Sequence, residues 1–163
     1  MADASAATGG RIEARLKALG IELPKAAAPA ANYVPYTVSG RLLFVAGQIT
    51  VWNGELRFLG TIGKDLTVEE GAQAARLSGL NLIAQAKAAC GGNLDRIGRV
   101  LKLVGFVQCI DGFKDQPKVI NGASDLMVEV FGEQGRHARV AVGTNALPLG
   151  VATEVEGTFE LAL

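Results

Sequence analysis

The first half of the chain carries dense apolar runs separated by turn signals. Three runs rich in Val, Leu, Ile, Phe and Tyr occupy residues 32–38, 42–48 and 52–58. Ser39-Gly40 and Asn53-Gly54 interrupt these runs, and glycine-containing dipeptides of this kind mark tight turns between strands. The pattern predicts three antiparallel strands joined as a meander.

Apolar positions at helical spacing predict two long helices. Residues 67–90 begin with Thr67 and Glu70, which have the spacing of a capping box, and Gly91-Gly92 follows the last turn. One face of this segment carries small and apolar side chains at steps of three and four: Val68, Ala72, Ala75, Gly79, Leu82, Ala86 and Ala89. The second helix is predicted over residues 115–131, with an inward face formed by Val119, Ala123, Leu126, Met127 and Val130.

The segment before the first strand has a different pattern. Residues 1–10 are small and polar and predict a disordered tail. Apolar side chains at helical spacing predict a short helix over residues 11–19, which Gly20 ends, and the Pro- and Ala-rich residues 24–31 predict a connector. We therefore expect a tail with a short helix over residues 1–27 and a single domain over residues 28–163.

Residues 137–162 predict two apolar strands folded into a hairpin on the turn Leu147-Pro148-Leu149-Gly150. Arg139 lies in the first strand and Glu154 in the second. A charged side chain in an apolar strand is costly unless something pairs with it. The pair therefore marks this segment as the candidate site.

The register of this hairpin follows from counting. If Ala146 pairs with Val151, Gly143 lies opposite Glu154, and Arg139 is on the same face roughly 13 Å further along the strand. The two side chains can then hold a small guest between them, and a guanidinium suits a carboxylate. An ion pair at a subunit contact or a solvated sheet face remains the alternative interpretation.

The order of predicted elements is strands, helix, strand at residues 99–110, helix, two strands. This order predicts an α+β domain in which both long helices cover one face of a mixed sheet. The other face is rich in Val, Ala and Leu, and no third long helix remains to cover it. An apolar face of this kind predicts an oligomer, and clefts at subunit boundaries are frequent ligand sites.

Composition narrows the possible functions. The 163 residues carry 16 Lys+Arg and 16 Asp+Glu, and this zero net charge argues against a dedicated nucleic-acid binder. His137 is the only histidine, and Cys90 and Cys109 form no C-x-x-C pattern. We therefore expect no metal site and two buried free thiols. The N-terminus lacks the features of a signal peptide and no apolar run has membrane-spanning length, so a soluble, cytoplasmic protein is expected.

Several segments resemble the RidA/YjgF family of imine deaminases. The run Ala138-Arg139-Val140-Ala141-Val142 precedes Leu147-Pro148 at the family spacing, and Glu154-Val155-Glu156 follows. The run Leu43-Phe44-Val45-Ala46-Gly47-Gln48 is similar to the family strand that ends in Ser-Gly-Gln. The resemblance extends from about residue 28 to residue 161. The N-terminal helix and the segment Asn32-Tyr33-Val34-Pro35-Tyr36 resemble a longer branch, often labelled YjgF-like or endoribonuclease L-PSP.

The resemblance implies a chorismate-mutase-like fold that forms a homotrimer, in which three sheets make a closed barrel with a cleft between each pair of subunits. It also implies hydrolysis of reactive enamines and imines, such as 2-aminoacrylate, to 2-oxo acids and ammonia. No cofactor is implied.

Position by position, the resemblance assigns Arg139 and the backbone N–H of Gly47 to the substrate carboxylate. It assigns Glu154 to the attacking water. It assigns Tyr33 and Asn121 to substrate binding, with a one-residue insertion between Asn121 and Arg139. The residues themselves leave alternatives open, because Tyr33 equally suits a packed strand tyrosine and Asn121 a first-turn residue that bonds its own backbone.

Three positions depart from the family pattern. Ala46 stands where the family has serine, and Ala141 where it has cysteine, so the presumed cleft loses two polar groups. His137 stands where the family usually has proline, and a lone histidine at a strand start is typical of a structural or solvated residue.

The resemblance, together with these departures from it, leaves three functions open. An enamine/imine deaminase and a non-catalytic trimeric sensor of 2-oxo acids or amino acids would use the same Arg139 site, and the two alanines favour the sensor somewhat. The third is an endoribonuclease. Zero net charge, a single histidine and the lack of interleaved basic and aromatic residues argue against it.

Overall fold

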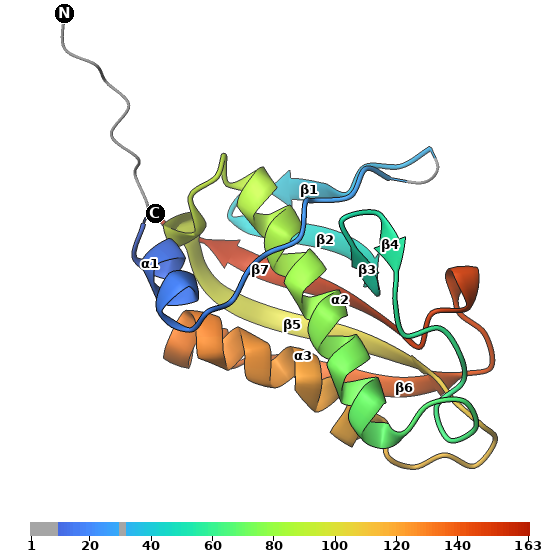
Figure 1. Ribbon diagram of the computed structural model, residues 1–163. Helices are drawn as coiled ribbons and strands as arrows, with labels where there is room; N and C mark the ends of the chain where they lie inside the picture. The colour runs from blue at the N-terminus through green and yellow to red at the C-terminus, as the bar shows by residue number, and fades with distance from the viewer. Residues whose placement is uncertain (1–9, 30–31) are drawn as a thin grey trace, which may run out of the picture.

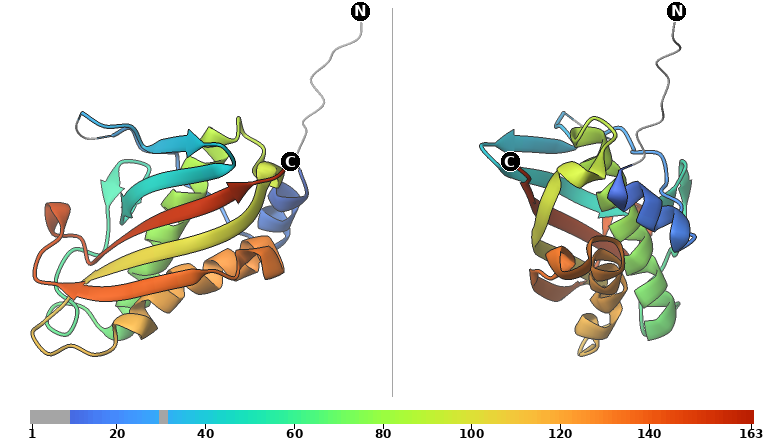
Figure 2. Two further views of the ribbon diagram at one scale, coloured as in Figure 1. Left: turned by 180° about the vertical axis from the view of Figure 1, so that it is seen from behind. Right: turned by 90° about the vertical axis from the view of Figure 1, so that its left-hand side faces the viewer.

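The structure, a computed structural model, describes residues 10–29 and 32–163. Its main sheet has five strands in the order β1-β2-β7-β5-β6 (Figures 1 and 2). Their bounds are β1 Tyr36–Ser39, β2 Leu42–Ile49, β5 Ile97–Gln108, β6 Ala138–Thr144 and β7 Thr153–Leu161. The β5–β6 pair is parallel and the other neighbouring pairs are antiparallel, which confirms the predicted mixed sheet.

Two long helices, α2 (Val68–Ala89) and α3 (Gln116–Phe131), lie side by side on one face of this sheet (Figure 1). The predicted capping box is confirmed, because the Thr67 hydroxyl accepts the Glu70 backbone N–H and the Glu70 carboxylate accepts the Thr67 N–H. The residues predicted to face inward from α3 are all buried. The expected α+β layering is therefore confirmed.

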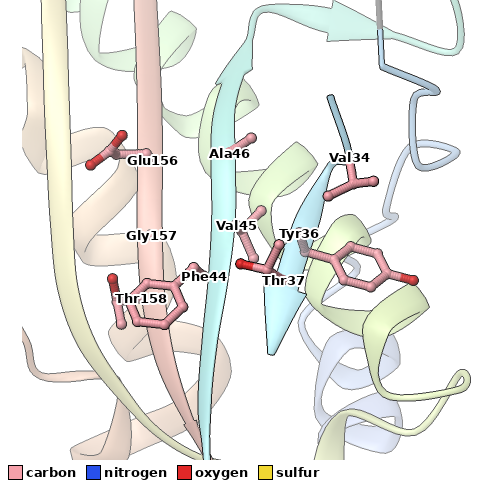
Figure 3. A pocket seen from close by; sticks show the side chains of 9 residues that line it. All are labelled: Val34, Tyr36, Thr37, Phe44, Val45, Ala46, Glu156, Gly157 and Thr158. Carbon is pink, nitrogen blue, oxygen red and sulfur yellow. The ribbon is translucent and has the colours of Figure 1, made fainter. Parts of the chain in front are cut away.

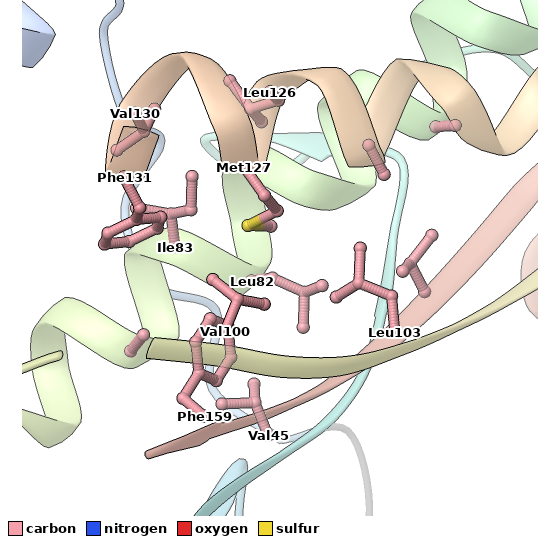
Figure 4. Packing of buried hydrophobic residues seen from close by; sticks show 14 of the residues in the cluster. Val45, Leu82, Ile83, Val100, Leu103, Leu126, Met127, Val130, Phe131 and Phe159 are labelled. Carbon is pink, nitrogen blue, oxygen red and sulfur yellow. The ribbon is translucent and has the colours of Figure 1, made fainter. Parts of the chain in front are cut away.

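The core lies between the helices and the sheet (Figure 4). Leu82 and Ile83 of α2 pack there with Leu126 and Met127 of α3. On the sheet side the core contains Val45, Val100, Leu103 and Phe159, and Leu103 and Phe159 are fully buried. Burial of each such side chain contributes about 1.5–3 kcal/mol relative to exposure, so this layer holds α3 firmly against β5.

The helix α1 (Arg11–Ala18) is a third helix, packed beside α3 and the short 3₁₀ turn at Leu94–Arg96 (Figures 1 and 2). The Asp95 carboxylate caps it from outside by accepting the N–H groups of Arg11 and Ile12, at 2.7 and 2.9 Å. These two bonds lower the pKa of Asp95. Most of the predicted tail at residues 1–10 lies outside the described residues.

The prediction of a third meander strand at residues 52–58 is wrong. The chain forms a separate two-stranded sheet instead, from β3 (Val51–Trp52) and β4 (Glu55–Leu56). Asn53 and Gly54 both have positive φ, as a tight two-residue hairpin turn requires. The chain therefore folds back after two residues and leaves the main sheet.

The predicted hairpin of residues 137–162 is also wrong, because β5 lies between β6 and β7. Leu103 of β5 is opposite both Arg139 and Gly157, and Phe106 is opposite both Val142 and Glu154. The expected pairing of Gly143 with Glu154 is therefore not formed. The cause is α3, which joins β5 to β6 as the crossover of a parallel pair and places β6 at one edge of β5. Strand β7 then pairs with the other edge.

The second face of the sheet carries no helix in the described part of the chain, as the view from behind shows (Figure 2). Large apolar side chains remain exposed on it, with 42% of Phe44, 42% of Val140 and 40% of Val142 accessible. This is the uncovered apolar face that the strand composition predicts.

Two further findings concern the lengths of the helices and the cysteines. Within the described residues, no helix is both long and apolar enough to cross a bilayer. Cys90 is buried and Cys109 half-buried, both as free thiols, and burial raises the pKa of each thiol.

Candidate functional site

Arg139 lies on the edge strand β6 and points toward α3. Its Nη1 donates to Asn121 Oδ1 at 2.8 Å and to Ser124 Oγ at 3.2 Å, and its Nη2 donates to the carbonyl of Pro117 at 3.1 Å. Asn121, which the resemblance assigns to substrate binding, is thus in direct contact with Arg139. The three acceptors are neutral and all come from one helix, so they fix the guanidinium plane and leave its charge uncompensated.

The guanidinium retains free donors. Of its five N–H groups, three are used in these contacts. The Nε–H and one N–H of Nη2 have no acceptor within the described residues, and no acidic side chain there forms an ion pair with Arg139. Because Nε and Nη2 share one edge of the planar group, this edge matches a carboxylate in the bidentate arrangement.

His137 and Ser124 extend the contacts of Arg139. His137 Nε2 is 2.9 Å from Ser124 Oγ, and His137 Nδ1 is 2.6 Å from the carbonyl oxygen of Gly135. A hollow of about 310 Å³ opens beside these groups, and the charged residues Arg136 and Asp125 also line it. Sequence reasoning missed Ser124, although it lies three residues after Asn121 and therefore on the same helix face.

Glu154 lies on β7 beside Gly47 of β2. A Cβ atom at position 47 would collide with the Glu154 carboxylate, so glycine at this position leaves the carboxylate room to lie against β2. A register shift between Val45 and Gln48 takes Ala46 and Gly47 out of the ladder with β7. Burial, and secondarily the neighbouring Glu156, raises the pKa of Glu154, whose carboxylate has no hydrogen-bond partner in the described part of the chain.

Tyr33 lies near Gly47 and away from Arg139. Tyr33 and Gly47 line a pocket of about 330 Å³ between β2 and the extended segment that precedes β1. Gln85 of α2 holds this segment by donating to the carbonyl of Ala27 at 2.7 Å. Tyr33 is 51% exposed and precedes β1, so it is not a packed strand tyrosine.

The two alanines that depart from the family pattern lie in different surroundings. Ala46 lines a hollow of about 260 Å³ over β1, β2 and β7, together with Phe44 and Glu156 (Figure 3). Ala141 faces the helices beside Arg139 and packs against the core. Only Ala46 therefore borders open space on the sheet side.

Arg139 and Glu154 lie on opposite faces of the sheet, so the expectation of a shared face is wrong. Arg139 is opposite Leu103, which is buried under α3. Glu154 is opposite Phe106, and the adjacent Val155 is the residue that points into the core. A single chain therefore presents two separate candidate half-sites. The first is Arg139 with Asn121, and the second is centred on Gly47, which lies beside Glu154 and shares a pocket with Tyr33.

The layered α+β arrangement with this sheet order defines the class of protein as the chorismate-mutase-like fold. Residues 13–159 match the family model described as "YjgF/chorismate mutase-like, putative endoribonuclease". The chain belongs to this family, and the resemblance to RidA/YjgF proteins is confirmed.

Similar proteins cover nearly the whole chain. Protein TCP17 of Trypanosoma cruzi is 49% identical over 158 residues, which are 96% of this chain and 98% of that protein. The crystal structure of Atu1372 from Agrobacterium tumefaciens, a protein of unknown function, is 47% identical with a TM-score of 0.86, covering 93% of this chain and 92% of its own. The crystal structure of a "putative endoribonuclease" from Shewanella oneidensis is 42% identical with a TM-score of 0.89, and the match covers 93% of this chain and 100% of that one.

Proposed function

We propose that this protein is an enamine/imine deaminase that hydrolyses small 2-imino and 2-enamino acids to 2-oxo acids and ammonia. The observation that carries the proposal is the Arg139 guanidinium, which three neutral acceptors of α3 hold in place. Its free Nε–Nη2 edge suits a carboxylate, the group that all these substrates share.

The complete site is proposed to form between two subunits of a homotrimer. The Arg139 half-site lies at an edge strand, and the Glu154 half-site borders the uncovered sheet face. Because the two halves lie on opposite faces of one chain, a substrate can contact both only if the halves come from neighbouring subunits. The exposed Phe44, Val140 and Val142 supply an apolar surface for such an assembly.

The proposed chemistry needs a water, a base and a held carboxylate. The enamine first becomes the imine by protonation at its terminal carbon. The carbon protonation gives the iminium ion, and water then adds to its carbon while Glu154 takes one proton of the water. Glu154 passes this proton to nitrogen and takes the remaining hydroxyl proton as the C=O bond forms. The carbon–nitrogen bond breaks, ammonia leaves, and Glu154 returns its proton to solvent, which replaces the proton used in the first step. The raised pKa of Glu154 makes its carboxylate a stronger base than an exposed glutamate.

A carboxylate sensor without turnover is the second candidate. It would use the same Arg139 half-site, and the observation that favours it is the apolar lining at Ala46, where the hollow has no side-chain hydroxyl from that position. A ribonuclease activity, which the family description names, finds less support because the chain carries no net charge.

Arg139→Ala tests the proposal. We expect the variant to fold like wild type, to lose pyruvate binding by NMR titration, and to lose hydrolysis of freshly generated 2-aminoacrylate. Truncating one member of a desolvated charge pair costs about 2–5 kcal/mol, which is more than tenfold in affinity.

Arg11→Ala is the matched control, because Arg11 is exposed at the start of α1, on the helix side of the molecule. It should leave binding and turnover unchanged. Unaltered pyruvate binding by Arg139→Ala would refute the carboxylate site. Binding without any hydrolysis in the wild-type protein would favour the sensor.

A further inference from the structure

A continuous series of hydrogen bonds lies behind the proposed carboxylate site and links Gly135, His137, Ser124 and Arg139 in that order. Its three distances are 2.6 Å from the Gly135 carbonyl to His137 Nδ1, 2.9 Å from Nε2 to Ser124 Oγ, and 3.2 Å from Ser124 Oγ to Arg139 Nη1. His137 and Ser124 thus connect the backbone at the start of β6 to the guanidinium.

The direction of each bond follows from the acceptor at the far end. A carbonyl oxygen only accepts, so His137 Nδ1 carries the proton. In the neutral ring Nε2 is then an acceptor, and the Ser124 hydroxyl donates to it. The lone pairs of Ser124 Oγ are thereby left for the Arg139 Nη1 donor. His137 therefore sets the rotation of the Ser124 hydroxyl.

The anchor of this series is rigid. Gly135 ends the 3₁₀ turn Gly132–Gly135, and a side chain at this position would collide with the carbonyl of Met127 in α3. Gly135 is buried and Met127 is fully buried. The carbonyl that receives His137 is consequently fixed to the same helix that supplies Asn121 and Ser124.

We infer that His137 is a positioning residue for ligand binding, which acts through Ser124 to hold Arg139 in its carboxylate-binding orientation. This inference rests on the proposed function. Without His137, the Ser124 hydroxyl is free to turn its proton toward the Arg139 donor, and one of the three fixed acceptors is lost. The free Nε–Nη2 edge is then less well oriented, and carboxylate ligands lose affinity more than neutral ones.

The test compares pyruvate with its uncharged analogue pyruvamide, using NMR titrations of the full-length protein. Ser124→Ala and His137→Phe should each weaken pyruvate binding by about twofold to tenfold, the usual scale of one hydrogen bond. Pyruvamide binding should be unchanged. Ser124→Thr, which keeps the hydroxyl, should restore most of the pyruvate affinity.

A double variant shows whether the two residues act in one series. Because His137 acts through Ser124, combining Ser124→Ala with His137→Phe should weaken pyruvate binding no more than the larger single change. Additive losses would overturn the inference. Equal losses for pyruvate and pyruvamide would also overturn it, since they would indicate a structural role.

Two further measurements keep the inference separable from the proposed function. The imidazole ¹⁵N shifts of the single histidine should report the Nδ1–H form in the wild-type protein, and the Nε2–H form would overturn the inference.

Ser39→Ala, at the far edge of the sheet, is the control and should bind pyruvate normally. If Arg139→Ala loses pyruvate binding while Ser124→Ala and His137→Phe bind pyruvate like wild type, the positioning role alone is overturned. Normal binding in Arg139→Ala would overturn the proposed function and this inference together.

Discussion

At the scale of single residues, Glu154 is a half-buried carboxylate with no hydrogen-bond partner in the described residues. Burial, with a smaller contribution from Glu156, raises its pKa above the ordinary value of 4.5. A group whose folded pKa is raised favours the folded state below its unfolded pKa, and this benefit is lost as the pH rises through the folded pKa. Ionised Glu154 therefore opposes folding at neutral pH, as a group kept for function often does.

Glu154→Gln should separate this stability effect from catalysis. At neutral pH the variant should melt at a higher temperature than wild type, and the difference should vanish below about pH 4.5, where the wild-type carboxyl is protonated. Calorimetry over this pH range measures it. Pyruvate affinity should change little, whereas any imine hydrolysis should fall about 10²–10⁴-fold, the scale of a general base.

Glu22→Gln provides the control for this change, because Glu22 is exposed and lies outside the sheet. It should alter neither the melting temperature nor turnover. If Glu154→Gln instead loses pyruvate binding and hydrolysis together, Glu154 orients Arg139 of a neighbouring subunit and is not a catalytic group.

At the scale of elements, the crossing of α2 and α3 determines where the carboxylate site lies. Gly122 of α3 faces the carbonyl of Ala72 in α2, and a methyl group at position 122 would overlap it. An ion pair between Arg76 and Glu129, with an N···O distance of 2.8 Å, joins the helices further along. This close contact fixes Asn121, the neighbour of Gly122, against Arg139.

Gly122→Ala should force the helices apart. We expect it to lower the free energy of unfolding by about 1–3 kcal/mol, the usual cost of overpacking, despite the better helix propensity of alanine. Urea denaturation measures this change. Gly79→Ala is the matched control on α2, because the new methyl group would meet the movable Leu126 side chain at 3.1 Å. If Gly122→Ala lowers the free energy of unfolding less than Gly79→Ala does, the proposed close contact is contradicted.

At the scale of the whole molecule, the uncovered sheet face and the divided site lead to one expectation. Light scattering should show a homotrimer in solution. Phe44→Glu places a charge on the apolar face and should give monomers that bind pyruvate more weakly, since the contacts of the second half-site are then lost. A monomeric wild-type protein at micromolar concentration would contradict the trimer and the cleft between subunits.

Leu19→Glu is the control for the trimer. Leu19 is 47% exposed but follows α1, on the helix side of the molecule. The same change in charge at this position should leave both the oligomeric state and pyruvate binding unchanged.

The local features of this protein were determined by sequence. Thr67 and Glu70 predicted the start of α2, because a capping box depends on side chains and backbone groups within one helical turn. The buried stripe of α3 followed from its spacing alone. The resemblance to the RidA/YjgF family named both Asn121 and Arg139 as candidate site residues, but it did not predict their direct contact.

Tertiary structure decided the relations between distant elements. Whether Arg139 and Glu154 share a face depends on which strands are neighbours, and β5 entered between their strands because α3 returns the chain parallel to it. The contacts of His137 likewise depend on the packing of α3 against β6. Residue spacing sets the faces of one helix or strand, but the order of strands in a sheet is set by how the helices pack across it.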